Sequence, residues 1–404
     1  MTCRICNNST YTVLDLGPTP PANSFISSIE EEIESFPLVL EYCSSCSNLQ
    51  LRDCLNSEKL YKNYYYVTPK SRTLDSHYNF LTNFLLVNNY LNSESCVVEV
   101  GSNIGDFLKH LKPYVRSTIG IDPAENIATE ANRLGIETIC DFFSTKSADN
   151  IKSKYGFADT IIARHCFAHN ESPHDLLKGV KLLMAPGGHV VIENAYAVNT
   201  IEGNEIDQIY HEHMFYYSIQ SMSKALELNG LVLVDVLISV VHGGSISFVA
   251  KHAENNPTVS DSVADYLLHE KTVLNEPRLR DFASSAFKIK RELSNLVKKL
   301  LNEGNTIYSY GATAKGNTLL NFIGLDNKSI SYCVDSTDIK QGKFLPGSKI
   351  KIIDEEEGLK NPPDYFLLTA WNYRDEIISK TRKSGNCSSS FIVPFPKLTI
   401  MPER

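Results

Sequence analysis

A dense group of polar side chains stands near the middle of the chain, at Tyr210-His211-Glu212-His213. Side chains of these types can accept a proton, present a neutral imidazole and donate a hydrogen bond to a developing oxyanion. The spacing is not the H-E-x-x-H of zinc proteases, whose two histidines share one helical face. The segment therefore predicts proton-transfer chemistry, with a polar and aromatic surface loop as the alternative.

Two Cys-x-x-Cys pairs lie near the N-terminus, at Cys3/Cys6 and at Cys43/Cys46. Four thiolates with this spacing suit a tetrahedral zinc ion, and four protein ligands make such a site structural and not catalytic. Unrelated free thiols and a redox pair are the alternatives, although neither pair opens a βαβ unit. Among ten cysteines this pattern indicates metal binding in a reducing compartment and not a disulfide framework.

A glycine-bracketed turn, Gly101-Ser102-Asn103-Ile104-Gly105, follows a short apolar run at 97–100 and precedes an apolar-periodic segment. Strand, glycine turn and helix in succession are typical of a nucleotide-type site in an open α/β sheet. The turn lacks the G-x-G-x-x-G spacing of a dinucleotide fingerprint. It therefore favours a nucleoside ligand such as S-adenosylmethionine over NAD.

Two further strand ends complete the predicted nucleoside site. Asp122 stands about 20 residues past the glycine turn, where an acid can bond ribose hydroxyls, and its alternative role is a helix cap. Asp141-Phe142-Phe143 ends the third predicted strand and is expected to face an adenine ring.

The elements that must position these residues alternate between strand and helix, as in a parallel α/β sheet. His169 follows the fourth predicted strand, and Val241-His242-Gly243-Gly244 joins the last two. A helix at 74–91 is predicted to precede the sheet. The predicted strands lie at 97–100, 118–121, 137–140, 160–163, 189–193, 232–237 and 245–250, with a helix at 173–184.

A second, smaller α/β unit is predicted after Asn255-Asn256-Pro257. A long helical stretch at 260–302 is expected to be broken into two by Pro277. Strand 306–310 then leads into the glycine turn 311–316, where Lys315 indicates an anionic ligand group such as the phosphates of a nucleotide sugar. The remaining strands of this unit are predicted at 331–334, 365–368 and 391–393.

The length, composition and net charge of the chain limit the classes of partner that it can bind. A length of 404 residues predicts two to three domains, and 42% hydrophobic with 21% charged residues is ordinary for a globular protein. Acidic residues outnumber basic ones by 47 to 39, giving a net charge of −8, so a nucleic-acid backbone is an unfavourable partner. With no signal peptide and no long apolar stretch, we expect a cytoplasmic protein without a membrane partner.

Together these features resemble the S-adenosylmethionine-dependent sugar C-methyltransferases, bacterial enzymes that act on nucleotide-linked keto-deoxysugars. The resemblance covers nearly the whole chain. One position departs from it, because the family has an acid or amide where this chain has Ile104. Besides the four cysteines, the matching motifs are Leu14-Asp15-Leu16-Gly17, Glu99-Val100-Gly101-Ser102-Asn103, Tyr210-His211-Glu212-His213, His242-Gly243-Gly244-Ser245, Tyr310-Gly311-Ala312-Thr313-Ala314-Lys315-Gly316, Phe344-Leu345-Pro346-Gly347 and Ala370-Trp371-Asn372.

The resemblance implies an α/β fold in three domains: an N-terminal zinc-binding domain (1–68), a central class I methyltransferase sheet (69–255) and a C-terminal Rossmann-like substrate domain (256–404). It implies transfer of a methyl group to C3 of a 4-keto-deoxysugar, with dTDP as the expected nucleotide, in a monomer or weak homodimer. The reaction that the resemblance implies passes through an enolate formed by deprotonation of C3.

The resemblance also implies the role of each site residue. His213 is the expected base, Glu212 orients the sugar or a histidine, Tyr210 and Tyr64 donate to the enolate oxygen, and His169 positions the substrate. The donor-binding set is Glu99, Gly101, Ser102, Asn103, Gly105, Asp122, Asp141, Phe142 and Phe143. The substrate-binding set is Lys315, Gly311 and His242.

Other functions stay open. An O- or N-methyltransferase acting on a nucleotide sugar would share most of these motifs. A non-catalytic sugar-nucleotide-binding homologue with an altered donor site is a second alternative, because of Ile104. A sugar-nucleotide oxidoreductase and a zinc-ribbon nucleic-acid binder fit the turn spacing and the net charge less well.

Overall fold

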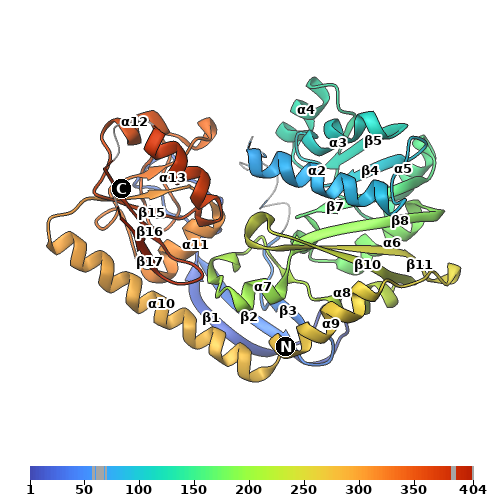
Figure 1. The fold of residues 1–404 in the computed structure, drawn as a ribbon, viewed down its shortest axis with the longest axis horizontal. Helices are drawn as coiled ribbons and strands as arrows, with labels where there is room; N and C mark the ends of the chain where they lie inside the picture. Colours follow the sequence, from blue (N-terminus) through green and yellow to red (C-terminus); the bar gives the residue numbers. More distant parts are fainter. Residues whose placement is uncertain (57–59, 61–67, 69–70, 384–387, 403–404) are drawn as a thin grey trace.

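Three β-sheets organise the chain in the computed structural model, which describes residues 1–56, 60, 68, 71–383 and 388–402 (Figure 1). The strands are β1 (Tyr11–Thr19), β2 (Phe36–Cys43), β3 (Asn48–Leu51), β4 (Cys96–Val100), β5 (Ser117–Asp122), β6 (Thr138–Cys140), β7 (Ala158–Arg164), β8 (Met184–Ala195), β9 (Phe215–Tyr216), β10 (Leu231–Ser239), β11 (Ser245–His252), β12 (Ile307–Tyr310), β13 (Cys333–Val334), β14 (Ile352–Ile353), β15 (Tyr365–Leu368), β16 (Ser390–Val393) and β17 (Thr399–Met401).

Helices separate the strands of the second and third sheets. The α-helices are α2 (Arg72–Val87), α3 (Asp106–Leu111), α4 (Glu125–Arg133), α5 (Thr145–Tyr155), α6 (Pro173–Leu183), α7 (Ala197–Glu202), α8 (Ile219–Glu227), α9 (Asp261–Val273), α10 (Glu276–Asn302), α11 (Ala314–Ile323), α12 (Glu355–Lys360) and α13 (Arg374–Lys383). The short 3-10 helices used below are η2 (Phe167–His169), η3 (Ile206–Gln208), η4 (Val241–Gly243) and η7 (Trp371–Tyr373).

The central sheet has the strand order β10-β11-β8-β7-β4-β5-β6. Strands β8, β7, β4, β5 and β6 are parallel, whereas β11 runs antiparallel to both of its neighbours. From β4 the chain adds β5 and β6 on one side and β7 and β8 on the other. The carboxyl end of β4 is therefore the switch point at which open α/β sheets bind ligands.

The C-terminal sheet, in orange and red in Figure 1, has the order β14-β13-β12-β15-β16-β17. All its pairs are parallel except β16–β17, and β12 with its glycine turn stands at the switch point. Helices α9 and α10 connect this sheet to the central one. The predicted break is confirmed, with Pro277 in the first turn of α10, where a missing N–H costs no hydrogen bond.

The N-terminal sheet has four antiparallel strands in the order β1-β2-β3-β9. Strand β9 comes from residues 215–216, directly after the polar segment at 210–213, so the sheet is completed by a distant part of the chain. Although a glycine and two prolines among residues 17–20 favour a loop, Gly17-Pro18-Thr19 ends strand β1. Edge strand β1 has a register shift before Pro18, and an edge position tolerates a proline that cannot donate to a partner strand.

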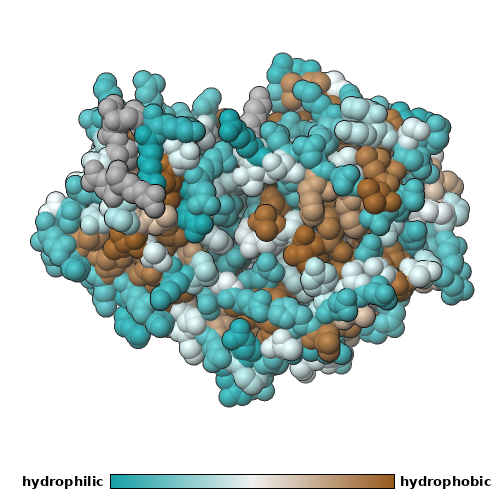
Figure 2. Space-filling model, viewed as in Figure 1, coloured by the Kyte–Doolittle hydropathy of each residue, from teal (hydrophilic) through white to brown (hydrophobic). Residues whose placement is uncertain are grey.

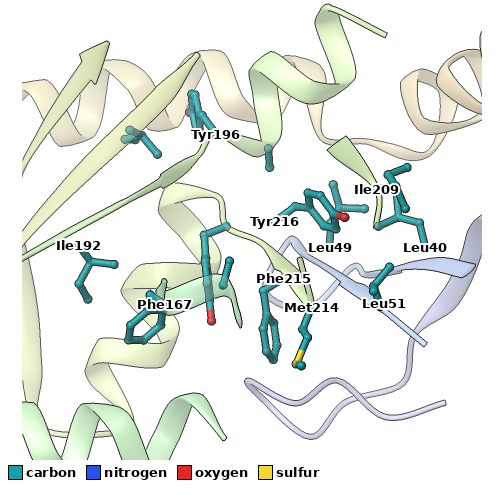
Figure 3. Close-up of a cluster of buried hydrophobic side chains, with 14 of the residues drawn as sticks. Leu40, Leu49, Leu51, Phe167, Ile192, Tyr196, Ile209, Met214, Phe215 and Tyr216 are labelled. Atoms are coloured by element: carbon teal, nitrogen blue, oxygen red, sulfur yellow. The ribbon is translucent and has the colours of Figure 1, made fainter. Parts of the chain in front are cut away.

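Burial follows these three sheets. Figure 2 shows that hydrophilic residues cover most of one face, with apolar residues gathered over the outer strands β10 and β11. A continuous apolar core joins the N-terminal and central sheets, and Figure 3 shows part of it, with Leu49 and Leu51 beside Met214 and Tyr216. In the part of the chain that the structure describes, no helix has the length and apolar character needed to cross a bilayer.

Candidate active site

The four predicted zinc ligands lie together around the turn between β2 and β3. Their Sγ atoms all lie within 4.8 Å of one another, with Cys3–Cys46 at 3.7 Å and Cys6–Cys43 at 3.5 Å. A zinc ion with Zn–S bonds of about 2.3 Å would hold tetrahedral sulfurs about 3.8 Å apart, so the donor set fits the metal. The main-chain N–H of Ile5 donates to the Cys3 Sγ atom, as second-shell donors to zinc thiolates do.

The glycine turn after β4 holds three left-handed positions, at every second residue, that suit a close approach of the backbone to a ligand. Gly101 has φ +65°, Asn103 +49° and Gly105 +78°. A Cβ atom on Gly101 would stand 2.5 Å from the Cβ atom of Cys166, so no larger residue fits there without displacement. The turn is fixed from β5, because the N–H of Gly101 donates to the carbonyl of Ile121 at 2.8 Å.

Buried polar atoms near the turn are available to a ligand. The Ser102 Oγ atom and the Glu99 Oε2 atom are buried and, within the described residues, accept or donate no hydrogen bond. The other Glu99 oxygen is held by the Arg164 guanidinium at 2.8 Å. Burial raises the pKa of Glu99, although Arg164 opposes that shift. These orphaned atoms and the glycine cradle fit the predicted methyl donor.

The acid predicted to bond ribose is tied to the turn. Asp122 accepts from the N–H of Asn103 and from the N–H of Ala124, both at 3.0 Å. The carboxylate therefore fixes the glycine turn and the chain that follows β5, and its predicted bond to ribose stays a prediction. Burial raises the pKa of Asp122 above its usual range, while these two N–H donors oppose the shift.

The three residues predicted to face adenine separate in the structure. Asp141 and Phe142 are exposed at the end of β6 and remain candidates for that role. Phe143 is buried in the core, where its ring packs against Gly179 of α6. Of the three side chains, it is the one that is already packed in the core.

The polar segment at 210–213 brings a phenol and an imidazole together. The Tyr210 hydroxyl lies 2.5 Å from the His213 Nε2 atom, and the His213 Nδ1 atom lies 3.1 Å from the carbonyl of Gln208. Since a carbonyl only accepts, Nδ1 carries the proton and Nε2 presents a lone pair, to which Tyr210 donates. The geometry thus sets His213 up as a proton acceptor.

The environment of His213 keeps its imidazole neutral. Burial lowers the pKa of His213 well below its ordinary value, and the nearby His169 and Lys315 add to that shift. The ring of His169 lies 5.2 Å from the ring of His213, and burial lowers the pKa of His169 to about 4. Both imidazoles are therefore neutral at pH 7.

Glu212 points away from His213 and toward the N-terminal region. Its Oε1 atom accepts from the Asn23 side-chain amide at 3.0 Å, and burial raises its pKa. The neighbouring His211 likewise turns to the N-terminal sheet, where its Nε2 atom donates to the carbonyl of Pro37 at 3.3 Å. Tyr64, predicted as a second phenol, lies outside the described residues.

A second group of histidines stands at the ends of β7 and β8. The Glu193 carboxylate lies 2.8 Å from the His77 Nε2 atom and 3.7 Å from the His165 Nε2 atom, and the ring of His165 contacts the ring of His242 with centroids 4.5 Å apart. Burial alone would raise the pKa of Glu193, but the neighbouring His77 holds it below its ordinary value. Burial, and then the positive charge of Lys315, lowers the pKa of His242 to about 3.

Lys315 lies at the contact between the central and C-terminal domains. Its Nζ atom donates to the carbonyl of His242 at 2.7 Å. Burial lowers the pKa of Lys315, whereas the negative charges of the Glu205 and Asp207 carboxylates favour its protonated form and so act to raise that pKa. The Trp371 indole donates to Asp207 at 2.6 Å across the same contact. An incoming phosphate would compete with these two carboxylates for Lys315, and its predicted role as an anion ligand stays a prediction.

A cavity of about 320 Å³ opens at this contact. It is lined by Asn199, Glu202, Gly203, Glu205, Gly243, Trp371 and Pro396. Burial raises the pKa of Glu205 to about 7. The predicted substrate residue Gly311 stands apart from this lining, and it packs so closely on Ala370 that a Cβ atom would lie 2.5 Å from the Ala370 Cβ atom.

Sequence reasoning missed several residues that the structure places in the site. Asn23, Gln208 and Asp207 carry no motif, and their partners lie on other elements. Trp371 belongs to a quoted motif and is the single tryptophan of the chain, a signal that could have drawn attention to it. His165 stands two residues past the predicted strand 160–163, at an edge where sites gather.

Comparison with protein-family models gives three matches along the chain. Residues 3–61 match a zinc binding domain, residues 74–236 a methyltransferase domain and residues 240–396 a C-methyltransferase C-terminal domain. The predicted zinc site and α/β fold class are confirmed by these matches together with the cysteine geometry and the sheets.

One curated relative and two solved structures extend the comparison. The C-methyltransferase NovU of Streptomyces niveus is 35% identical over 400 residues, covering 98% of this chain and 95% of that protein. The N-methyltransferase NodS of Bradyrhizobium japonicum has 13% identity and a TM-score of 0.34, covering 45% of this chain and 98% of that one. Magnesium protoporphyrin IX methyltransferase of Synechocystis has 12% identity and a TM-score of 0.34, covering 46% and 86%.

Proposed function

The chain belongs to the C-methyltransferase family and is an S-adenosylmethionine-dependent enzyme, and on that premise we propose that it methylates C3 of a nucleotide-linked 4-keto-deoxysugar. We propose dTDP as the nucleotide. The observation that carries the proposal is the His213–Tyr210 pair, an imidazole acceptor and a phenol donor held 2.5 Å apart. An acceptor and a donor side by side suit the formation of an enolate next to a ketone.

A carbon atom becomes nucleophilic when a neighbouring carbonyl can hold the charge that deprotonation leaves behind. His213 Nε2 takes the C3 proton, since Gln208 holds the other ring nitrogen as a donor. The Tyr210 hydroxyl moves its hydrogen bond from His213 to the C4 oxygen as negative charge develops there. His169 positions the sugar beside His213.

When bound, S-adenosylmethionine supplies an electrophilic methyl group on a sulfonium. Gly101, Ser102, Asn103 and Gly105 would hold it from the turn, with Asp122 fixing that turn and Glu99 offering its free oxygen. Asp141 and Phe142 would flank the adenine.

The sugar nucleotide would lie between the central and C-terminal domains. The cavity beside Glu205, Gly243 and Trp371 supports this placement, because it opens at that contact and offers a carboxylate for sugar hydroxyls. We propose His242, Lys315 and Gly311 as the residues that border the nucleotide side.

Exchange of the C3 proton with solvent tests the base directly. In D₂O with the dTDP-linked 4-keto sugar, wild-type protein should exchange the C3 proton of the sugar for deuterium. His213→Asn should lower the rate of this exchange at least a hundredfold. His269→Asn, at a half-exposed histidine on α9, is the matched control and should exchange as wild type. Wild-type exchange in His213→Asn and in His213→Ala would show that another group is the base.

The substrate itself is identified by a panel of dTDP-, GDP- and CDP-linked 4-keto sugars, read by mass spectrometry for the gain of one methyl group. Carbon–carbon connectivity in the product, read by NMR, separates C-methylation from O- or N-methylation. A panel in which no member gains a methyl group would contradict the sugar assignment.

A further inference from the structure

The N-terminal sheet, with its zinc site, contacts the segment that carries the proposed base. We propose that this sheet positions residues 209–216, termed here the catalytic segment, and that Asn23 is a positioning residue for Glu212. The proposal rests on the proposed role of His213. It assigns to the zinc domain a part in catalysis that needs no contact with the reactants.

Main-chain hydrogen bonds join the catalytic segment to the N-terminal sheet. Strand β9 pairs with β3, with Leu49 opposite Tyr216 and Gln50 opposite Phe215. The N–H of Leu51 donates to the carbonyl of Met214 at 2.9 Å. The segment is therefore the fourth strand of the zinc-bearing sheet, although it lies more than 150 residues later in the sequence.

The opposite side of the catalytic segment is bonded to the central domain. The N–H of Met214 donates to the carbonyl of Ala168 at 2.9 Å, next to the proposed substrate residue His169. Met214 thus bonds to the N-terminal sheet through its carbonyl and to the central domain through its N–H. The position of His213 depends on both.

Apolar packing holds the same contact. Figure 3 shows Leu40, Leu49 and Leu51 of the N-terminal sheet beside Ile209 and Tyr216 of the catalytic segment. All five side chains are at most 2% exposed. Because interiors are close-packed, a displacement of the sheet would move the segment with it.

A hydrogen bond between Glu212 of the catalytic segment and Asn23 completes the contact. Glu212 is 2% exposed and accepts from Asn23, while within the described residues its Oε2 atom has no hydrogen-bond partner. Removing the Asn23 amide would leave a buried carboxylate without this donor, which is costly in a low-dielectric interior. Since Glu212 precedes His213 directly, the loss of this hydrogen bond would change the position of the proposed base.

The zinc site is connected to β3 by short contacts. Cys43 lies opposite Asn48 in the β2–β3 pair, and the Asn48 amide contacts Cys3 Sγ at 3.7 Å and Gln50 at 3.1 Å. Gln50 in turn lies opposite Phe215 of β9. Without the metal, the bonds through zinc that tie the first cysteine pair to the second are lost, so β3 and then β9 should loosen.

Hydrogen–deuterium exchange of the full chain tests this coupling without relying on activity. We expect metal-stripped protein to exchange its amides at 209–217 at least tenfold faster than zinc-loaded protein, while the amides of β4 keep their rate. Affinity for S-adenosylmethionine, measured by calorimetry, should change less than twofold. Unchanged exchange at 209–217, with faster exchange at 1–52, would overturn the proposal.

Substitution of Asn23 tests the polar contact in zinc-loaded protein. Asn23→Leu keeps the volume without the donor, and we expect kcat to fall at least tenfold with an unchanged KM for S-adenosylmethionine. Asn23→Gln keeps an amide and should recover part of kcat. Thr10→Val, which removes a bond to Glu41 within the same sheet, is the matched control and should keep wild-type kcat.

Zinc content, one ion per chain in every variant, excludes loss of the metal as the cause. A wild-type kcat in Asn23→Leu would refute the role of Asn23. If wild-type protein methylates no sugar of the panel, the proposed function fails, while the exchange experiment still decides whether the sheet holds the segment.

Discussion

Replacing Gly101 by alanine should damage the proposed methyl-donor site through one identifiable contact. The added Cβ atom would lie 2.5 Å from Cys166 Cβ and 2.9 Å from Cys166 Sγ, well inside van der Waals contact. Neither atom is the end of a long flexible side chain, so the backbone of the turn or of Cys166 must move. The turn cannot move freely, because Gly101 N–H is bonded to Ile121 on β5.

The size of the effect has two parts. Holding alanine at a φ of +65° costs about 1–2 kcal/mol. Overpacking a filled site costs a further ~1–3 kcal/mol. We therefore expect Gly101→Ala to lose about 2–5 kcal/mol, divided between the free energy of unfolding and the free energy of donor binding.

A double-mutant cycle separates the two parts. Cys166→Gly removes the side chain that the new methyl group would strike, at the cost of its own hydrogen bond to the Val100 carbonyl. In Gly101→Ala/Cys166→Gly the overpacking cost should disappear and the backbone cost should remain, giving a favourable coupling of about 1–3 kcal/mol. Urea unfolding and calorimetry with S-adenosylmethionine measure both quantities on all four proteins.

Two results would refute the reasoning. If Gly101→Ala has the wild-type free energy of unfolding and the wild-type donor affinity, the turn relaxes without cost. A coupling energy near zero, with a damaged single variant, would mean that Cys166 is not the group that excludes a side chain.

Two further predictions follow from buried groups. Burial lowers the pKa of His189 to about 4, so the unfolded chain takes up this proton first as the pH falls, and this histidine alone should cost the folded state about 2 kcal/mol between pH 7 and pH 5. The other buried histidines add their own losses, so urea unfolding at both pH values should show a loss about 2 kcal/mol smaller in His189→Gln than in wild type; equal losses would contradict it. Trp371→Phe leaves the buried Asp207 without its indole donor and should destabilise the protein by about 1–3 kcal/mol, whereas Trp371→Phe/Asp207→Asn should recover part of that loss in thermal unfolding.

Features with a local signature were predictable from the sequence. Apolar runs ending at Val100 and Ala163 marked the parallel strands, and two identical cysteine spacings marked the metal site, because each depends on residues that are near in sequence. The break before α10 followed from the covalent chemistry of Pro277 alone. Such features need no knowledge of distant contacts.

The contacts that were not predictable join residues far apart in the chain. Strand β9 is two residues long and has no pattern of its own, and only its pairing with β3 makes it a strand. Phe142 and Phe143 look equivalent in sequence, yet adjacent residues at a strand end point in opposite directions, and the core takes Phe143. The Asn23–Glu212 bond likewise has no local cause.

The surroundings of His213 draw on all three domains. Gln208, which holds the His213 ring, belongs to η3, and the neighbouring Asp207 is bonded to Trp371 of the C-terminal domain. Glu212, on the other side, is bonded to Asn23 of the N-terminal region. The proposed base is accurately placed only when all three domains are packed, so distant substitutions at either contact should lower kcat before they alter donor affinity. The proposed donor site is instead the turn between β4 and α3, which neither contact touches.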